Sequence, residues 1–582
     1  MISPDGNYVA RHVLEGELDL ERRILPKHRL EIISVECLER ELTISQCVVL
    51  SPSNFERSGN RPRWSIDSTA FVSGSRQTLY GLDGSVKPLV GYPWAIEPRV
   101  IDLEGPDGKG PPPAPRTPDD QYLIVNGQGI AVGHQRWEPE NLVIQSVTGH
   151  SLEVSRLAAE AGDVGTGRRW IYPSTRGEAF WYWSPTLGER GRLVAFTPDG
   201  LNDVSLPASA KGPRKLVADE ATNEPVALLD AFGIHPLPGS EDALAWLIRE
   251  LDDVRAAGQP LVRSVTVAVA AKVAFVRLQP GLSPCFEDWL LTSNTSVRIS
   301  DVCAATPIDV AYAVSYVEVP GTVNLPARLY KSNVSLGKKR NLIVYMHGGP
   351  TANSLDAIML DDLYADGRFD VLAVDFRGST GLGFSHMRAL RPPVGDISAE
   401  DLRLALNWVR AQREYRDGLV GVWGSSWGGL SVHAIASRDS SGIDFLISNS
   451  GFIEKPPENI DDLCDASGWV PYVYGAYIDA KGDCLAAYSG VLGRKVNTKA
   501  AFLSLSGAIE QIGTPFKTQM LWATRARKEG ACVSTIYSES GGHAGMRWPA
   551  DSRTRVQEII RAWIDDVSDR DRKACGFDTR LP

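Results

Sequence analysis

The hydrophobic pattern of this chain changes at Tyr312, and that change restricts the possible folds more than any other feature. Beyond it, fully apolar runs alternate with amphipathic segments. A run that is apolar at every position is typical of a strand in a parallel sheet, because helices cover both faces of such a sheet. Four such runs occupy residues 342–346, 371–374, 419–423 and 445–447. We therefore expect an α/β domain over residues 306–582.

The segments between and after these runs have the spacing of helices that cover a sheet. One helix is expected to begin at Ser398, with Glu400 and Asp401 in its first turn, where carboxylates stabilise the helix dipole. Others are expected over residues 516–530 and near the C-terminus. The apolar positions are Leu402, Ala405, Leu406 and Val409 in the first helix and Val556, Ile559, Ile560, Trp563, Ile564 and Val567 in the last.

Residues 1–305 follow a different pattern, in which short apolar runs alternate with turn clusters and long helical periodicities are few. Clusters at residues 3–6, 64–68 and 197–200 each adjoin a strand-like run, and Pro, Asp and Gly favour such bends. Hairpins that recur in this way predict an all-β, β-propeller-like domain. A β-sandwich is the alternative, and the number of blades stays open.

Length and composition exclude several classes of protein. A chain of 582 residues is too long for one hydrophobic core, since domains usually contain about 100 to 250 residues. The net charge is −10, and the basic residues do not cluster as a nucleic-acid site requires. No apolar stretch reaches the roughly 18 residues of a membrane span, and no Cys/His spacing suits a metal. We expect no cofactor, no metal, no nucleic acid and no membrane span. The oligomeric state is open.

The eight cysteines fall into four pairs of sequence neighbours, which are Cys37 and Cys47, Cys285 and Cys303, Cys464 and Cys484, and Cys532 and Cys575. Such pairs form local disulfides in an oxidising compartment, but buried free thiols fit the sequence equally well. The first residues have neither the basic nor the apolar region of a leader. The expected location is cytoplasmic or, if a leader precedes this sequence, periplasmic or secreted.

The strongest chemical signal is Gly424-Ser425-Ser426-Trp427-Gly428-Gly429, which follows an expected strand and precedes a helix-like run of small residues. A serine between glycines at a strand-to-helix turn is the pattern of a nucleophile elbow. The glycines leave room for the tight turn, and the next N–H points at the charge that develops on the substrate. We predict that Ser426 is the nucleophile. The alternative is a Gly/Ser loop without a catalytic role.

A second glycine-rich segment, His347-Gly348-Gly349-Pro350, follows the apolar run 342–346. α/β hydrolases place an oxyanion-hole loop at this point of the fold. We predict that the oxyanion hole is formed by His347, by the N–H groups of Gly348 and Gly349, and by the N–H of Trp427. A plain turn at the end of a strand is the alternative.

His543 is the expected general base. It follows the strand-like residues 533–537, lies between glycines, and comes after the nucleophile as the chain order of this fold requires. The other histidine downstream of Ser426 is His433, which lies inside the expected elbow helix.

Five segments in order make this chain resemble the prolyl oligopeptidase family of serine peptidases. They are residues 347–350, 374–381, 395–396, 421–429 and 537–543. The resemblance covers about residues 312–567. It implies a β-propeller ahead of an α/β hydrolase, with the propeller restricting access to a cavity between the two. His347-Gly348-Gly349-Pro350 is most similar to the acylaminoacyl and dipeptidyl branches, whereas Arg547-Trp548-Pro549 resembles the lasso-peptide isopeptidase branch.

The family's third catalytic residue, an aspartate that orients the histidine, has no clear counterpart. The sequence from Pro515 to His543 contains no Asp, and the segment that carries this Asp in the family looks deleted. Glu510 has a suitable separation from His543 but precedes the Thr-Pro step, Glu529 ends a basic helix, and Glu539 is very near the histidine. The third member is one of these three glutamates or absent.

The sequence therefore predicts a serine peptidase that hydrolyses short peptides or acyl-peptides through a Ser-His acyl-enzyme mechanism. One alternative is a catalytically impaired propeller-hydrolase scaffold, since loss of the orienting acid lowers turnover by about 10⁴. Another is a carboxylesterase. Trp427 replaces a Tyr that is usual in the family, so a changed substrate-facing surface is expected there. Residue preference is not readable from the sequence.

Overall fold

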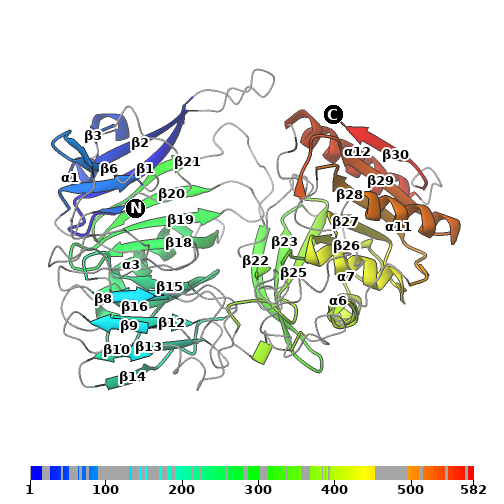
Figure 1. Cartoon of the computed structure of the whole chain (residues 1–582), viewed down its shortest axis with the longest axis horizontal. Helices are drawn as coiled ribbons and strands as arrows, with labels where there is room; N and C mark the ends of the chain where they lie inside the picture. Colours follow the sequence, from blue (N-terminus) through cyan, green and yellow to red (C-terminus); the bar gives the residue numbers. More distant parts are fainter. Residues whose placement is uncertain are drawn as a thin grey trace. The chain divides into compact units, whose positions relative to one another are not determined.

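The computed structural model of the chain divides into two compact units (Figure 1). The first contains Met1–Ala257, Leu261–Gln279 and Cys285–Ala305, and the second contains Gly258–Pro260, Pro280–Pro284 and Thr306–Pro582. The residues that the structure describes are 2–15, 27–40, 43–51, 63–64, 68–73, 78–88, 130–133, 143–146, 151–153, 170–173, 180–184, 191–197, 200–211, 215–222, 224–255, 260–279, 286–301, 312–334, 339–349, 352–354, 367–382, 385–386, 389–390, 394–438, 440–451, 494–509, 516–543, 548, 550–569 and 575–581.

Within the described ranges, the first unit contains six antiparallel sheets of three or four strands, each made of strands that are consecutive in the chain. The predicted turn at residues 3–6 lies just ahead of β1, whereas residues 65–67 and 198–199 of the other two predicted turns lie outside the described residues. The strands are β1 (Tyr8–Glu15), β2 (Lys27–Ser34), β3 (Val48–Leu50), β4 (Arg63–Trp64), β5 (Ala70–Ser73), β6 (Thr78–Gly81), β7 (Val86–Pro88), β8 (Ile130–Gly133), β9 (Val143–Ser146), β10 (Ser151–Glu153), β11 (Trp170–Pro173), β12 (Phe180–Ser184), β13 (Arg192–Thr197), β14 (Gly200–Val204), β15 (Lys215–Ala218), β16 (Pro225–Asp230), β17 (Gly233–Pro236), β18 (Leu261–Ala268), β19 (Val273–Gln279), β20 (Glu287–Thr292) and β21 (Ser296–Asp301).

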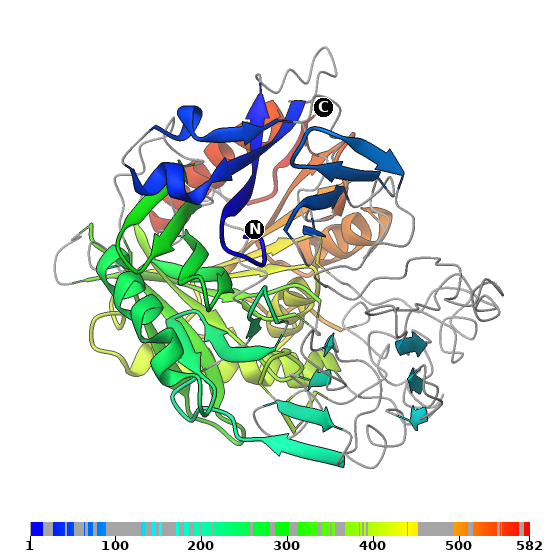
Figure 2. The ribbon, with the colours of Figure 1, turned by 90° about the vertical axis from the view of Figure 1, so that its left-hand side faces the viewer.

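Neighbouring sheets of this unit share apolar cores. Ile33 of β2 and Leu290 of β20 belong to one core, which joins the first sheet to the last. Ile32 of β2 and Phe71 of β5 belong to another, which joins the first sheet to the second. Two further cores join β11–β14 to β15–β17 and β15–β17 to β18–β21. The first sheet therefore packs between the second and the last, and Figure 2 shows the blue and green strands as neighbours.

The expectation that residues 1–305 are all-β is wrong within the described residues, because α3 (Glu241–Arg255) is a helix of 15 residues. Leu244, Leu247 and Leu251 are buried at helical spacing and contribute to the core shared by β15–β17 and β18–β21. Glu241 lies in its first turn and Arg255 in its last, where each charge suits the helix dipole. A single amphipathic helix is easily missed among many short strands.

The second unit is built on a nine-stranded sheet in the order β22-β23-β25-β24-β26-β27-β28-β29-β30 (Figure 1). The β22–β23 and β23–β25 pairs are antiparallel, and all the other pairs are parallel. The strands are β22 (Tyr312–Val319), β23 (Leu325–Ser332), β24 (Asn341–Met346), β25 (Phe369–Val374), β26 (Val420–Ser425), β27 (Phe445–Asn449), β28 (Ala501–Gly507), β29 (Val533–Ser538) and β30 (Asp578–Leu581), and the helices are α6 (Val394–Ala411), α7 (Trp427–Ala436), α11 (Phe516–Lys528) and α12 (Ala550–Ser568).

The four apolar runs of the sequence are strands β24 to β27, as predicted, and α11 and α12 occupy two of the expected helices. The α6 helix begins at Val394 and not at Ser398. Val394 is fully buried in the core and follows a proline, which favours the start of a helix, so Asp396 occupies the first turn. Among the helices within the described residues, none is long and apolar enough to cross a membrane.

Residues 510–515, where the sequence predicts that the loop carrying the family's Asp is deleted, lie outside the described residues, but strand β28 ahead of them was not foreseen. All seven of its residues are buried. Ser504 and Ser506 interrupt the apolar pattern, which hides the strand from sequence analysis. Ser504 is accommodated because its hydroxyl donates a hydrogen bond to the side chain of Gln519 in α11, at 3.3 Å.

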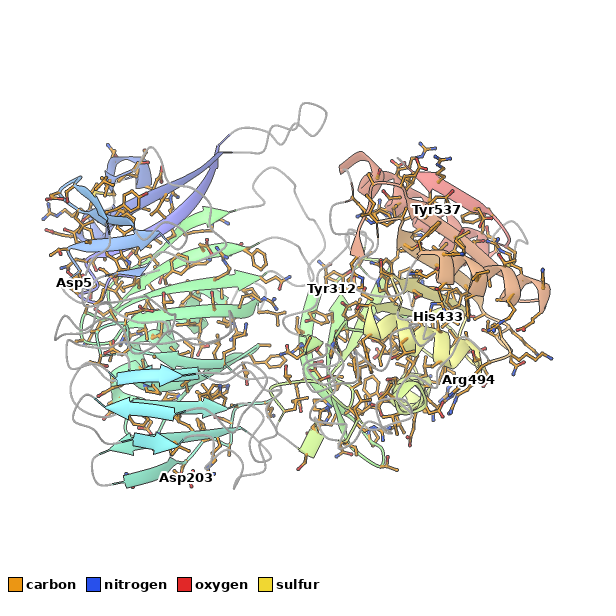
Figure 3. The ribbon with its side chains drawn as sticks, in the orientation of Figure 1. Asp5, Asp203, Tyr312, His433, Arg494 and Tyr537 are labelled. Carbon is orange, nitrogen blue, oxygen red and sulfur yellow. A yellow bond between two sulfur atoms is a disulfide. The ribbon has the colours of Figure 1, made fainter. Side chains whose placement is uncertain are left out.

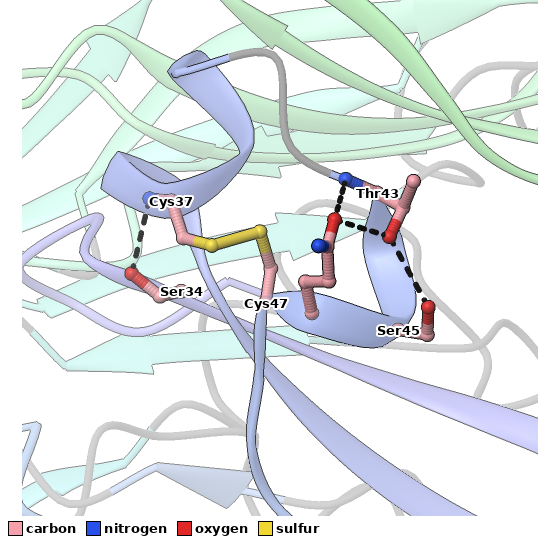
Figure 4. Close-up of a disulfide and its surroundings, with 6 residues drawn as sticks. Ser34, Cys37, Thr43, Ser45 and Cys47 are labelled. Carbon is pink, nitrogen blue, oxygen red and sulfur yellow. Dashed lines mark hydrogen bonds between the residues drawn. A yellow bond between two sulfur atoms is a disulfide. The ribbon is translucent and has the colours of Figure 1, made fainter.

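Two of the four expected cysteine pairs are disulfides. Cys37 and Cys47 link the start of a short helix, α1 (Val35–Glu39), to the residue before β3, and Ser34 caps that helix by accepting a hydrogen bond from the Cys37 N–H (Figure 4). Cys532 and Cys575 link the residue before β29 to the segment before β30. The other four cysteines lie outside the described residues.

His433 lies in α7 and is fully buried in the core of the second unit (Figure 3). Its ring contacts Phe502 and Trp522, at 5.0 and 4.3 Å between ring centroids. Its Nε2 atom lies 3.1 Å from the hydroxyl oxygen of Ser448. Burial lowers the pKa of His433 to about 3, because the apolar surroundings disfavour the imidazolium. The folded protein therefore holds this imidazole neutral at physiological pH.

This buried imidazole predicts that the second unit is destabilised by acid. Below pH 6.5 the unfolded chain binds a proton at His433 that the folded chain does not, so the free energy of unfolding falls by about 2 kcal/mol between pH 6.5 and pH 5 and continues to fall toward pH 3. His433→Gln removes this titration and is expected to reduce the loss by that amount. Urea unfolding followed by tryptophan fluorescence at the two pH values measures it, and an equal loss in both proteins contradicts the assignment.

Candidate active site

Ser426 stands at a sharp turn between β26 and α7. Its backbone has φ 52° and ψ −115°, a conformation that residues other than glycine rarely adopt. The turn is held because the Ser426 N–H donates a hydrogen bond to the carbonyl of Asn449 at 2.9 Å and the Leu430 N–H donates to the Ser426 carbonyl at 3.3 Å. Ser426 is partly exposed at the carboxyl end of its strand. This is the geometry expected of a nucleophile elbow.

The glycines around Ser426 are required by the close approach of backbone segments. A Cβ atom on Gly424 would lie 2.1 Å from the Gly428 carbonyl oxygen, and one on Gly428 would lie 2.0 Å from the Met346 carbonyl oxygen. Both distances are far below a normal contact, so a side chain at either position would push α7 away from β24 and β26. The sequence pattern around the serine is thus a steric requirement of this turn.

The predicted oxyanion loop lies against Ser426. A Cβ atom on Gly348 would be 3.0 Å from the Ser426 Cβ and 3.1 Å from the Ser425 carbonyl oxygen. Gly349 has φ 54°, which favours glycine. Trp427 is the first residue of α7, and the N–H groups of a helix's first turn have no partner within the helix. The structure therefore brings Gly348 and the N-terminal end of α7 together beside Ser426.

The His347 ring lies behind this loop and is fully buried. It stacks on Phe376, with 4.3 Å between ring centroids. Nδ1 lies 3.0 Å from the Gly348 carbonyl oxygen, which only accepts hydrogen bonds, so Nδ1 carries the proton. Burial lowers the pKa of His347 below its ordinary value, so the ring is neutral and Nε2 accepts from the Ser379 hydroxyl at 2.7 Å. The imidazole thus anchors the loop and is not directed at a substrate.

The Trp427 side chain does not form a substrate-facing surface, contrary to the expectation from the sequence. Its exposed fraction is 2%, and it packs in the apolar core between the sheet and its helices. Trp427 is the first residue of α7, and its side chain points back toward the sheet and is buried there. Only the backbone of Trp427 is placed to serve the site.

His543 lies on the loop after β29, and its exposed fraction is 9%. Two carbonyls precede it in this loop, and both accept hydrogen bonds. The Ile509 N–H, from the segment after β28, donates to the Gly541 carbonyl at 3.0 Å, and the Trp548 indole donates to the Gly542 carbonyl at 3.1 Å. Ser426 and His543 therefore stand at the carboxyl ends of parallel strands of one sheet, where β27 and β28 lie between them.

Two of the three candidate acids make their contacts elsewhere. Glu529 accepts a hydrogen bond from the Val496 N–H at 2.7 Å and lies 3.6 Å from the Arg525 side chain. Glu539 forms an ion pair with Arg580 of β30. The third, Glu510, lies outside the described residues, and only Ala508 and Ile509 separate it from the end of β28.

The segment 374–381, which carries part of the family resemblance, makes several buried polar contacts. Ser379 is the partner of His347, as described above. Asp375 accepts a hydrogen bond from the Ser354 N–H at 2.6 Å, and Arg377 donates to Asp401 of α6 at 2.7 Å. These buried polar contacts tie the region after β25 to α6 and to the chain beyond the oxyanion loop. Across the described part of the chain, no group of three or more His, Cys, Asp or Glu side chains is arranged to hold a metal.

Comparisons with known proteins agree with this geometry. The family model of the alpha/beta hydrolase fold matches residues 341–482. Acylamino-acid-releasing enzyme of Sus scrofa is 35% identical over 96 residues, which are 16% of this chain and 13% of that enzyme. Dipeptidyl-peptidase 5 of Aspergillus oryzae is 30% identical over 141 residues, which are 23% of this chain and 19% of that protein. The chain thus matches less than a fifth of the length of either relative.

Two solved structures share the fold over nearly the whole chain. One comes from a structural and mechanistic analysis of two prolyl endopeptidases, with a TM-score of 0.54 at 13% identity, and the likeness covers 98% of this chain and 81% of that one. The other is dipeptidyl peptidase 4 of Porphyromonas gingivalis, with a TM-score of 0.52 at 11% identity, covering 97% of this chain and 89% of that one. Identities this low show the fold alone.

The contact between Gly348 and Ser426 gives a prediction. Gly348→Ala places a methyl group against the Ser426 Cβ, so we expect labelling of Ser426 by a fluorophosphonate probe to slow by about 100-fold. Gly233→Ala is the matched control, because a Cβ there meets nothing closer than 3.9 Å, at the Arg255 side chain. Equal labelling rates for the two variants would show that the close packing of Gly348 against Ser426 does not affect the reactivity of Ser426.

Proposed function

We propose that this chain is a member of the prolyl oligopeptidase family of α/β hydrolases and that it hydrolyses short peptides or acyl-peptides through an acyl-enzyme on Ser426. One observation supports this most directly. The strained elbow holds Ser426 at the carboxyl end of β26, and Gly348 lies against it. Nucleophile and oxyanion loop are thus positioned before a substrate binds, which is how such sites lower the barrier.

In the proposed reaction, His543 accepts the proton of the Ser426 hydroxyl while that oxygen attacks the carbonyl carbon of the scissile bond. The carbonyl oxygen becomes an oxyanion and accepts hydrogen bonds from the N–H of Trp427 and from the Gly348–Gly349 loop. The imidazolium then donates its proton to the leaving nitrogen, the C–N bond breaks, and an acyl ester remains on Ser426. A water molecule, deprotonated by His543, then attacks the acyl carbon, the ester bond to the Ser426 oxygen breaks, and the imidazolium returns its proton to that oxygen as the acid product leaves.

Glu510 is the residue that we propose as the third member of the triad. In this fold the acid follows the nucleophile and precedes the histidine in chain order, and Glu is used as well as Asp. The segment after β28 is joined to the His543 loop, since the Ala508 N–H donates to the Ser538 carbonyl at 2.8 Å and the Ile509 N–H donates to the Gly541 carbonyl at 3.0 Å. Glu510 is the next residue in the sequence.

Substitution of the three glutamates separates these candidates. Glu510→Gln keeps the shape but removes the charge that stabilises the imidazolium, so we expect kcat to fall by about 10³- to 10⁴-fold. Glu529→Gln and Glu539→Gln are matched controls with the same chemical change, and their kcat is expected to stay within about threefold of wild type. Full activity of Glu510→Gln, or a large loss in either control, would contradict the assignment.

We also propose that the six sheets described in the first unit are blades of a β-propeller. The packing of the first sheet against the last supports a ring, because in a ring the two ends of the chain segment must meet. The two disulfides support a location in an oxidising compartment, such as the periplasm or the cell exterior, since such bonds seldom persist in the cytosol.

The proposed activity is tested by a fluorophosphonate probe and a substrate panel. We expect the probe to modify Ser426 in the wild-type protein and to leave the Ser426→Ala variant unmodified. The panel contains acyl-peptides, dipeptidyl anilides, p-nitrophenyl esters and, because of the resemblance at Arg547-Trp548-Pro549, a lasso peptide with its isopeptide bond. Cleavage of esters alone would favour a carboxylesterase. Absence of both labelling and turnover would favour a catalytically impaired scaffold.

A further inference from the structure

Trp548 comes between His543 and α12, and the proposed reaction gives it no role. Its exposed fraction is 6%, so its indole is directed into the protein and not at a substrate. The indole N–H donates a hydrogen bond to the carbonyl of Gly542 at 3.1 Å, and Gly542 is the residue immediately before His543. The ring also covers Gly541, where a Cβ atom would lie 2.4 Å from the indole nitrogen.

The peptide that joins Gly542 to His543 is the part of the loop that this bond controls. A peptide unit is planar, so fixing its carbonyl also fixes the direction in which the His543 backbone leaves it. Two successive glycines precede the histidine, and glycine has more backbone freedom than any other residue. Without an external contact, rotation at Gly541 and Gly542 would move the imidazole.

The carbonyl of each of these two glycines accepts a hydrogen bond from outside the loop. The Gly541 carbonyl accepts from the Ile509 N–H, and the Gly542 carbonyl accepts from the indole of Trp548. Gly507 closes the other side, where a Cβ atom would lie 2.2 Å from the Gly541 carbonyl oxygen and 2.6 Å from that of Gly542. The two carbonyls are therefore held between the end of β28 and an indole ring.

We propose that Trp548 is a positioning residue, whose indole N–H orients the general base through the Gly542 carbonyl. This inference rests on the proposed function for its effect on turnover but not for its effect on the loop. A residue that acts in this way changes the rate of proton transfer from Ser426 and leaves substrate binding largely intact.

Trp548→Phe tests the inference, because it keeps an aromatic ring and removes the donor. We expect kcat and the rate of fluorophosphonate labelling to fall together by about 10- to 100-fold, with KM within about twofold of wild type. The matched control is Trp522→Phe. Trp522 is a fully buried tryptophan of the same unit, and its indole nitrogen has no hydrogen-bond partner. Its kcat is expected to match wild type, and an equal loss of kcat in both variants would overturn the proposal.

Two further measurements keep the inference testable if Trp548→Phe folds poorly or if the enzyme proves inactive. Benzothienylalanine at position 548 replaces only the N–H by sulfur, so it is expected to reproduce the loss with little change in melting temperature. Hydrogen exchange of the 540–543 amides reads the loop without any turnover. Exchange is expected to quicken in Trp548→Phe and not in Trp522→Phe. Unchanged exchange would overturn the proposal, whereas faster exchange in a protein that never reacts would overturn only the proposed function.

Discussion

The close approach of backbone segments around Ser426 is the constraint on which the catalytic unit depends. Gly424, Gly428 and Gly348 each stand where a Cβ atom would meet another segment at 3.1 Å or less. Their small size lets α7 begin directly above β24 and β26 and lets the oxyanion loop touch the elbow. The strained conformation of Ser426 persists because these contacts surround it, and the strain exposes the hydroxyl.

The parallel sheet extends this arrangement from one residue to a complete site. Backbone hydrogen bonds connect the strand ends in turn: Ser426 to Asn449 after β26, Ser450 to Leu505 at 2.8 Å, and Ile509 to Gly541 on the loop of the histidine. Because each loop is hydrogen-bonded to the next, His543 is placed relative to Ser426 by backbone contacts and not by side-chain packing alone. The hydrogen bonds of the His347 ring to the Gly348 carbonyl and the Ser379 hydroxyl likewise fix the position of the predicted oxyanion loop.

Much of this could be predicted from the sequence, and the failures have physical causes. Strands that are apolar at every position can be recognised from the sequence. The elbow can be recognised as well, because its glycines are sterically required. Strand β28 was not predicted, because Ser504 and Ser506 interrupt its apolar pattern although all seven of its residues are buried. The burial of the Trp427 ring depends on tertiary packing that no local pattern encodes.

The claim that Ser426 forms an acyl-enzyme is tested most directly by trapping that intermediate. An acyl-peptide substrate is mixed with the enzyme, the reaction is quenched in acid within milliseconds, and peptides are mapped by mass spectrometry. We expect the mass of the acyl group on the peptide that contains Ser426, at a level that follows the pre-steady-state burst. Turnover of the same substrate with no adduct, or with the adduct on another residue, would contradict the account.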